Sequence, residues 1–373
     1  MSDEFRKVTI LADYASRELA GKVHGLLTEK QIPNGLNDFN PDDLYVNRFR
    51  SREYQIRIDT NVRGRDVFVF ISPLSLTDRW AGSPEEGNYL YLPDSQLAKT
   101  DIIGDALSQA GASSIRFVMP HQTYQRQDSK STDALTGEPQ REPLSVRGFS
   151  RIVSNYQSQG AKILTVSPHF RQLAAIYPAG GLEEITTRVV FSEYLEKKFG
   201  KKLAQLAGFS PDAGAERLVM GICEDVGIVY FGHCGKDRSK PGEVGGLRVY
   251  SHLPIEQIKD KIVIIPDDII DSGGTLITTA TQLMELGAKQ VYALMAHPVL
   301  TDNALEKLKQ GKLNLVTTDS ISHDFSGYPN VDVVSLDYIL HEAIASMVSG
   351  ASISGHLFNY QRFKEEKQRR RLW

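Results

Sequence analysis

The stretch KIVIIPDDIIDSGGTLI, residues 261–277, decides the class of fold that the sequence predicts. Its run IVII is apolar at every position, which is typical of a central parallel strand covered on both faces. Asp267 and Asp268 follow that run, and a polar turn with two glycines leads into a helical pattern at 275–288. We therefore predict a strand at 261–266 that ends before the acids, then a turn at the N-terminus of a helix.

Short β-branched runs alternate with longer amphipathic stretches along most of the chain. This order predicts an α/β fold, with parallel sheets and crossover helices. Ligands of such sheets bind beyond the carboxyl ends of the strands. The predicted strands are 7–11, 66–72, 115–120, 162–167, 217–222, 228–231, 261–266, 290–296, 313–318 and 331–336. The predicted helices include 16–27, 100–111 and 275–288.

The residues after the apolar run of 261–266 suit a sugar phosphate. Free backbone N–H groups and the dipole at a helix N-terminus attract an anion, and glycine lets the backbone approach it closely. Adjacent carboxylates can hold ribose hydroxyls or a metal ion beside that phosphate. A solvated loop is the plain alternative, but the position at a strand-to-helix junction favours the binding site. The candidate residues are Asp267, Asp268, Asp271, Ser272, Gly273, Gly274 and Thr275.

Composition limits the remaining choices. A chain of 373 residues exceeds the usual size of one hydrophobic core, so two domains are expected. Its net charge of −3 gives no support for nucleic acid or a membrane as the main partner. The opening residues show neither a signal-peptide core nor a transmembrane run, so we expect a cytoplasmic protein without disulfides. Neither a CxxC or HExxH zinc motif nor a Walker GxxxxGK[ST] loop occurs.

The acids and the small-residue loop that Thr275 closes resemble the phosphoribosyltransferase superfamily. Further motifs narrow the resemblance to the ribose-phosphate diphosphokinase (phosphoribosyl pyrophosphate, PRPP, synthetase) family, from about Lys7 to Tyr360. That family implies two related type I phosphoribosyltransferase-like domains, each with a mainly parallel sheet flanked by helices. The implied division is 1–177 and 178–342, with 343–360 returning to the first domain and 351–360 in the place of the family's last strand. The basic residues at 361–373 indicate a solvated tail.

The segment NRFRSREYQIRI (47–58) resembles the part of the family that reaches the adenine of ATP across a dimer. By that match Phe49 stacks on the base and Glu53 contacts its amino edge. Ser51 stands where the family usually has Asn. The resemblance thus implies an ATP site that needs a homo-oligomer, a dimer at the least, with hexamers also common in the family.

The segment PHQTYQRQDSKS (120–131) resembles the family's RQD element, with Arg126, Gln127 and Asp128 beside the ATP phosphates. A guanidinium fork is well suited to phosphate oxygens. The polar stretch that follows, 131–142, is longer than the family's link, and we expect a mobile loop there. Arg141 then begins the family's R-x-P-L-S stretch and is a further ATP-binding candidate.

Two further motifs imply metal and pyrophosphate binding. TVSPHF (165–170) matches a strand that ends in a metal-associated histidine, here His169, although Ser167 replaces the usual acid. FSPDAGAERLV (209–219) resembles the pyrophosphate loop, in which Asp212 would hold Mg²⁺. The backbone of that loop would face the phosphates at Ala213, Gly214 and Ala215.

GKDRSKPGEV (235–244) resembles the family's catalytic lid, with Lys236 and Arg238 closing over the reacting phosphates. The implied reaction joins ATP and ribose 5-phosphate: the C1 hydroxyl of the sugar attacks the β-phosphorus, giving PRPP and AMP. Lys236, Arg238, Arg126 and Mg²⁺ would neutralise the transferring oxygens.

Three alternatives stay open at this point. The chain could be a non-catalytic regulatory homologue, which the insertion at 131–142 and the replacements Ser51 and Ser167 suggest. It could be a phosphoribosyltransferase that consumes PRPP, although such an enzyme has no need of an ATP segment. The acceptor could also be a ribose-containing molecule larger than ribose 5-phosphate.

Overall fold

The computed structural model divides into two compact units. The first comprises Met1–Ile185, Ser320–Ser322 and Asp337–Ser352, and the second comprises Thr186–Asp319, His323–Leu336 and Ile353–Trp373. The structure describes residues 7–29, 39–76, 89–127, 130, 132–133, 136–170, 172–212, 214–236, 247–251, 254–311 and 313–371. The sequence placed the return to the first unit at 343–360, whereas the contacts place it at Asp337–Ser352.

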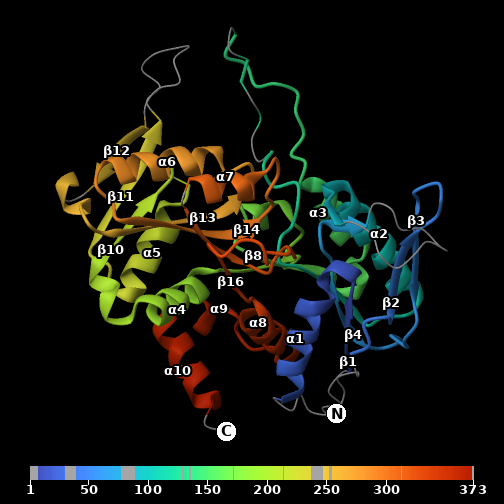
Figure 1. The fold of residues 1–373 in the computed structure, drawn as a ribbon. Helices are drawn as coiled ribbons and strands as arrows, with labels where there is room; N and C mark the ends of the chain where they lie inside the picture. Colours follow the sequence, from blue (N-terminus) through green and yellow to red (C-terminus); the bar gives the residue numbers. More distant parts are fainter. Residues whose placement is uncertain are drawn as a thin grey trace. The chain divides into compact units, whose positions relative to one another are not determined.

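The first unit is built on a five-stranded parallel sheet (Figure 1). Its order is β1-β4-β7-β8-β9, and neighbouring strands pair with no antiparallel member. The strands are β1 (Val8–Ala12), β4 (Asp66–Phe70), β7 (Ser114–Met119), β8 (Lys162–Val166) and β9 (Leu182–Ile185). Two hairpins add β2 (Leu44–Arg48) with β3 (Tyr54–Ile58), and β5 (Leu74–Leu76) with β6 (Tyr89–Tyr91).

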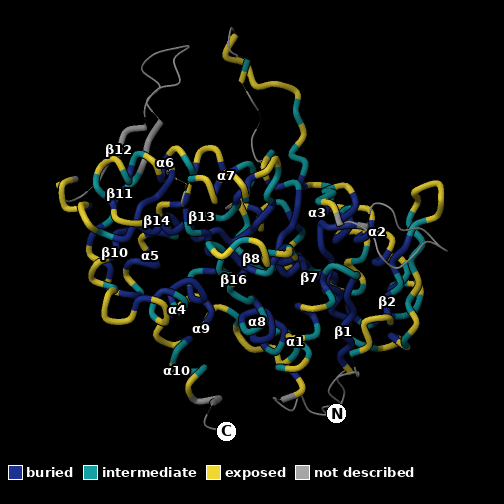
Figure 2. Tube along the Cα trace, viewed as in Figure 1, coloured by how far each residue is buried: buried dark blue, intermediate teal, exposed yellow. Residues whose placement is uncertain are grey.

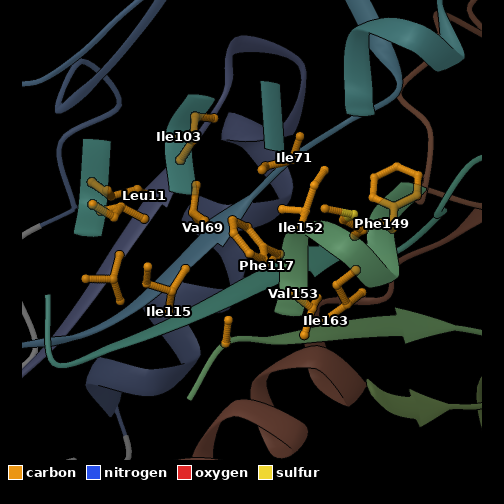
Figure 3. Close-up of a cluster of buried hydrophobic side chains, with 14 of the residues drawn as sticks. Leu11, Val69, Ile71, Ile103, Ile115, Phe117, Phe149, Ile152, Val153 and Ile163 are labelled. Atoms are coloured by element: carbon orange, nitrogen blue, oxygen red, sulfur yellow. The ribbon is translucent and has the colours of Figure 1, made fainter. Parts of the chain in front are cut away.

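One face of this sheet carries a continuous hydrophobic core (Figure 3). Every second residue of the strands points into it, as the pleat requires, so that Val69, Ile115, Phe117 and Ile163 are fully buried. The helices of the unit are α1 (Arg17–Glu29), α2 (Pro93–Gln109), α3 (Arg147–Asn155) and α8 (Asp337–Ser349), with short 3-10 helices η1 (Tyr14–Ser16), η2 (Gln157–Gln159) and η3 (Leu173–Ile176). Ile103 of α2 and Phe149, Ile152 and Val153 of α3 complete the core.

The second unit has a seven-stranded sheet of order β12-β11-β10-β13-β14-β15-β16. All its pairs are parallel except β11 with β12. The strands are β10 (Leu206–Ser210), β11 (Tyr230–Lys236), β12 (Leu247–Ser251), β13 (Ile262–Ile270), β14 (Gln290–Pro298), β15 (Asn314–Thr318) and β16 (Val331–Val334). The helices are α4 (Arg188–Phe199), α5 (Glu216–Val226), α6 (Gly274–Glu285), α7 (Ala304–Gln310), α9 (Ser354–Leu357) and α10 (Tyr360–Arg371), with 3-10 helices η4 (Gly200–Gln205) and η5 (Ile255–Ile258).

The central strands β13 and β14 are buried over most of their length (Figure 2). Val263 and Ile265 of β13 pack with Leu276 and Leu283 of α6 in one hydrophobic core. This arrangement holds the N-terminus of α6 at the carboxyl end of β13, where a parallel sheet binds its ligands.

The predicted end of the central strand at residue 266 is wrong. β13 continues through both acids to Ile270, because β14 is equally long and pairs with it as far as Ile270 opposite Pro298. Asp267 and Asp268 therefore lie near the C-terminal end of strand β13 and not in a loop.

The predicted strand at 217–222 is also wrong, since these residues belong to helix α5. Val219, Ile222, Cys223 and Val226 are buried at helical spacing. The true strand is β10, whose sequence LAGFS contains no β-branched residue and was missed. Gly208 is needed there, because a Cβ would lie 2.4 Å from the Cys223 sulfur.

The predicted last strand at 351–360 and the solvated tail at 361–373 are wrong as well. Helices α9 and α10 occupy most of this part of the chain. Phe363 is fully buried, and Lys364 and Lys367 donate to Glu196 and Glu193 of α4 at 2.9 and 2.7 Å. The apolar anchor and the opposite charges explain why a basic segment docks here. In the part of the chain that the structure describes, no helix combines the length and the apolar character that crossing a membrane requires.

Candidate active site

Three predicted carboxylates meet at the carboxyl edge of the second sheet. β10 pairs in register with β13, so Asp212, just after β10, lies at the same edge as Asp267 and Asp268. Burial, reinforced by the negative charge of Asp268 and to a smaller extent of Asp212, raises the pKa of Asp267 to about 8. Without a ligand, burial and the neighbouring charges favour a proton on the Asp267 carboxyl group.

The two strand acids are oriented by the backbone. Oδ1 of Asp267 accepts the Asp268 N–H at 2.9 Å, and Oδ1 of Asp268 accepts the Ile269 N–H at 2.9 Å. One oxygen of each carboxyl group is thereby fixed, which orients the other for a hydroxyl or a cation.

The turn between β13 and α6 has the features of a phosphate site. Gly273 adopts a left-handed conformation with φ 74°, and as the N-cap residue of α6 it has no side chain that could cap the helix. A Cβ at Gly273 would have no neighbour closer than 3.8 Å, so glycine is required by the backbone conformation and not by space. The Thr301 hydroxyl donates to Asp271 and holds the turn from the loop after β14. Ser272, Gly274 and Thr275 complete the turn, and the last two are exposed.

The predicted pyrophosphate loop is organised around Asp212. Its Oδ1 accepts the N–H groups of Gly214 at 2.7 Å and Ala215 at 3.1 Å, and the Ser210 hydroxyl donates to its carbonyl oxygen. The carboxylate thus closes the turn before α5. Ala213 lies outside the described residues.

The predicted lid is only partly described. Lys236 is the last residue of β11, opposite Leu247 of β12, and Arg238 lies outside the described residues. The roles of both cations stay predictions.

The RQD element in the first unit contacts the R-x-P-L-S stretch. The Ser145 hydroxyl donates to Oε1 of Gln127, so the two motifs on either side of the insertion are joined. Within the insertion, Thr132 and Pro139 form an isolated antiparallel β-bridge, and Gly137 has a left-handed backbone conformation with φ 70°. Arg126 and the exposed Arg141 are described, whereas Asp128 lies outside the described residues.

Phe49 lies at the tip of the β2–β3 hairpin and is 46% exposed. The loop is closed by the Phe49 N–H donating to the Glu53 carbonyl at 2.9 Å. The Ser51 hydroxyl donates to Oε2 of Glu53 at 2.6 Å. Ser51, which departs from the family pattern, thus donates a hydrogen bond to the Glu53 carboxylate, which was predicted to contact the amino edge of adenine.

The His169 segment is shaped by a residue that the sequence did not point to. Oε1 of the buried Gln125 accepts a hydrogen bond from the His169 N–H at 2.7 Å. Gln125 lies within the segment 120–131, but no role was predicted for it from the sequence. Ser167, at the position of the usual acid, has a left-handed φ of 39°, and its N–H donates to Ile185 at 2.8 Å. Serine is strained in this conformation, so the turn is determined by tertiary packing.

Magnesium can be tested against these donors. Over the described residues, no three His, Cys, Asp or Glu side chains form a group that could hold a metal ion. Mg²⁺ nevertheless binds commonly through one or two carboxylates together with substrate phosphates. Asp212 and Asp268 offer such oxygens beside the phosphate turn, so the second unit fits a magnesium ion that arrives with its substrate.

The fold defines a class of protein: an α/β protein of the phosphoribosyltransferase type, with two mainly parallel sheets flanked by helices. The chain matches the N-terminal domain of ribose phosphate pyrophosphokinase over residues 8–148 and the phosphoribosyl synthetase-associated domain over residues 252–359. It belongs to the ribose-phosphate pyrophosphokinase family.

Individual relatives agree with that assignment. The chain is 31% identical to the ribose-phosphate pyrophosphokinase of Cereibacter sphaeroides, covering 84% of each protein. It is 30% identical to that of Oceanobacillus iheyensis, covering 83% of this chain and 87% of the relative. The crystal structure of phosphoribosylpyrophosphate synthetase from Mycobacterium smegmatis superposes with a TM-score of 0.71 at 24% identity, covering 93% of this chain and all of the other, which shows the shared fold.

Proposed function

We propose that this protein transfers the pyrophosphoryl group of ATP to the C1 hydroxyl of ribose 5-phosphate, giving PRPP and AMP. The observation that carries the proposal is the turn with a glycine N-cap at the start of α6, which follows the strand that bears Asp267 and Asp268. Membership of the ribose-phosphate pyrophosphokinase family supports it.

The sugar phosphate fits the second unit. The 5-phosphate would lie against the backbone N–H groups of residues 272–275, at the positive end of the α6 dipole. A protonated Asp267 has one O–H donor and remaining acceptor oxygens, so a ribose hydroxyl can both accept and donate there. Asp268 supplies a second acceptor beside it.

The nucleotide fits the motifs of the first unit. Phe49 would stack on adenine. The Glu53 carboxylate would accept a hydrogen bond from the adenine amino group, either in place of its hydrogen bond from the Ser51 hydroxyl or in addition to it. Arg126, Gln127 and Arg141 would contact the phosphates, with Asp128 beside them. Since Phe49 would serve a neighbouring copy, the active form would be a homo-oligomer.

Transfer needs alignment and charge neutralisation more than covalent help from the protein. Lys236, Arg238 and Arg126 would bind the transferring oxygens as charge develops on them. Bound Mg²⁺, held by Asp212 with His169 as a second candidate, would supply charge neutralisation at the phosphates.

The test is to incubate the purified protein with Mg-ATP and ribose 5-phosphate and resolve the nucleotides by mass. AMP and PRPP, which is ribose 5-phosphate with a diphosphate added at C1, are expected in equal amounts. ADP in place of AMP contradicts the proposal. If no turnover occurs in a folded, ATP-binding protein, the regulatory-homologue alternative becomes the better one, and PRPP consumption with a free base would indicate a transferase.

A further inference from the structure

The hairpin of β2 and β3 is separate from the main sheet of the first unit. It forms a two-stranded sheet of its own, so side-chain contacts fix its position against the rest of the unit. Leu44 and Val46 of β2 join the hydrophobic core, and β3 contacts helix α2 (Figure 1). These contacts hold the strands. The tip at 49–53, which bears Phe49 and Glu53, depends on what holds its two ends.

Arg48 lies at one end of that tip. It is the last residue of β2 and pairs with Tyr54 of β3 in the last pair of the ladder. Its Nη2 group donates to the Tyr54 hydroxyl at 2.7 Å and to Oγ of Ser95 in α2 at 2.8 Å, with a longer contact to Oγ of Ser75 in β5 at 3.4 Å. The guanidinium carbon also lies 4.5 Å from the centroid of the Tyr54 ring. One side chain therefore joins both ends of the tip to β5 and α2.

The two serines that accept from Arg48 belong to a rigid support. Both are buried. The buried Lys99 of α2 donates to the carbonyl oxygens of Ser72 at 2.8 Å and Leu74 at 3.1 Å, and it forms an ion pair with Asp13 after β1. These three acceptors match the three donors of an ammonium group. Helix α2 and the start of β5 are thus held together, and a contact to both fixes the tip to the body of the unit.

The acceptors of Arg48 are three neutral hydroxyls. A planar guanidinium, with its donors in fixed directions, suits several acceptors at once better than a flexible ammonium group does. Phe49 directly follows Arg48, and Glu53 directly precedes Tyr54. Both residues predicted to contact adenine are therefore attached to the pair that this guanidinium holds.

We propose that Arg48 is a positioning residue for the base of ATP: it orients Phe49 and Glu53, and so sets both the affinity for the nucleotide and the preference for adenine. A tip that is held in place loses less conformational freedom when the nucleotide binds. The inference rests on the proposed function in placing adenine at this tip. It requires ATP binding and does not require turnover.

The experiment measures binding of Mg-ATP and Mg-ITP to the full chain by isothermal titration calorimetry, without ribose 5-phosphate. ITP has the same triphosphate, but an oxygen replaces the adenine amino group, so it cannot donate from that position to Glu53. Arg48→Met keeps an unbranched side chain and removes the donors. It should raise Kd for ATP roughly tenfold and Kd for ITP only about threefold. Attraction between the Arg48 charge and the triphosphate would instead weaken both nucleotides equally.

Arg57→Met is the matched control on the same hairpin. Arg57 of β3 lies over the Tyr45 ring at 4.8 Å and pairs with Asp59 at 2.6 Å, at the end of the hairpin away from the tip. Its replacement should leave Kd for both nucleotides unchanged. Thermal unfolding of each variant verifies the fold, because a purely structural role of Arg48 would lower Tm and leave the ratio of the two Kd values as in the parent.

Ser95→Ala provides a milder variant if Arg48→Met does not fold. It removes the acceptor on α2 and keeps the arginine, so Kd for ATP should rise about threefold. The inference is overturned if the folded Arg48→Met protein, or Ser95→Ala in its place, binds ATP as the parent does, or if ATP and ITP weaken by the same factor. A parent that binds no ATP also overturns it. The proposed reaction fails separately, when a parent that binds ATP forms no AMP with ribose 5-phosphate.

Discussion

The turn at 271–275 and the hairpin tip at 49–53 are both predicted to bind part of a substrate, but they are built differently. The turn is fixed by a long central strand, by the left-handed Gly273 and by the Thr301 hydroxyl on Asp271. The hairpin tip exposes Phe49 and binds Glu53 with its own Ser51. The turn predicted to bind the sugar phosphate is therefore preorganised, whereas in the segment predicted to bind adenine the carboxylate of Glu53 is already hydrogen-bonded within the loop.

This difference has a consequence for substitutions. A preorganised turn loses function when its backbone is disturbed, and a segment at a hairpin tip loses only the contact that is removed. The four predictions that follow run from the largest expected effect to the smallest.

Lys236→Ala tests the chemistry that both substrate segments serve. A cation placed on developing phosphate charge contributes mainly to the transition state, so kcat should fall on the order of a hundredfold or more. The measurement is steady-state turnover, with thermal unfolding to verify the fold. Lys307→Ala, on the exposed surface of α7, is the control and should keep normal turnover. A near-normal kcat in a folded Lys236→Ala protein would contradict the role predicted for this cation.

Gly273→Ala tests the preorganised turn. A Cβ at φ 74° is strained, and the turn would shift to relieve it. We expect KM for ribose 5-phosphate to rise roughly tenfold while KM for ATP changes little. Gly327→Ala is the control, since it lies in open space on the surface and is not in a left-handed conformation. Equal changes in both KM values would show that the turn is not dedicated to the sugar phosphate.

Phe49→Ala tests the hairpin tip. Loss of stacking should raise KM for ATP about fivefold to tenfold and leave the sugar parameter nearly unchanged. Phe358→Ala removes a ring of similar exposure, 44% against 46%, and should leave both KM values unchanged. A change confined to ribose 5-phosphate would refute the adenine assignment of this segment.

Asp267→Asn tests the electrostatics of the site without substrate. The pKa of Asp267 is raised to about 8, so the folded protein binds this proton more tightly than the unfolded chain. The stabilising contribution is complete below the unfolded pKa and is lost as pH rises towards about 8. The Asn variant lacks this loss. Its Tm should therefore exceed that of the parent at alkaline pH, by on the order of 5 °C relative to the difference at acidic pH.

Thermal unfolding of both proteins from acidic to alkaline pH, without ligands, measures that change. Asp302→Asn alters an exposed carboxylate in the same unit and should show no such trend. A constant Tm difference between Asp267→Asn and the parent across the range would mean that Asp267 is already ionised at neutral pH.

The sequence by itself determined the α/β class, the central apolar strand, the glycine turn and the family. These features are local. The apolar run IVII predicts a buried strand by its residue pattern, and the glycine pair predicts a turn through its backbone conformation. The family assignment followed because several such motifs occur in one order along the chain.

Only the tertiary structure decided where the elements end and what the side chains experience. β13 continues through Asp267 because β14 pairs with it up to Ile270. Residues 217–222 belong to helix α5, whose Cys223 side chain packs closely against Gly208 of β10. The basic end of the chain folds because α4 supplies Glu193 and Glu196. Strand pairing, burial and charge are set by residues distant in sequence, so the raised pKa of Asp267 appears only when the chain is folded.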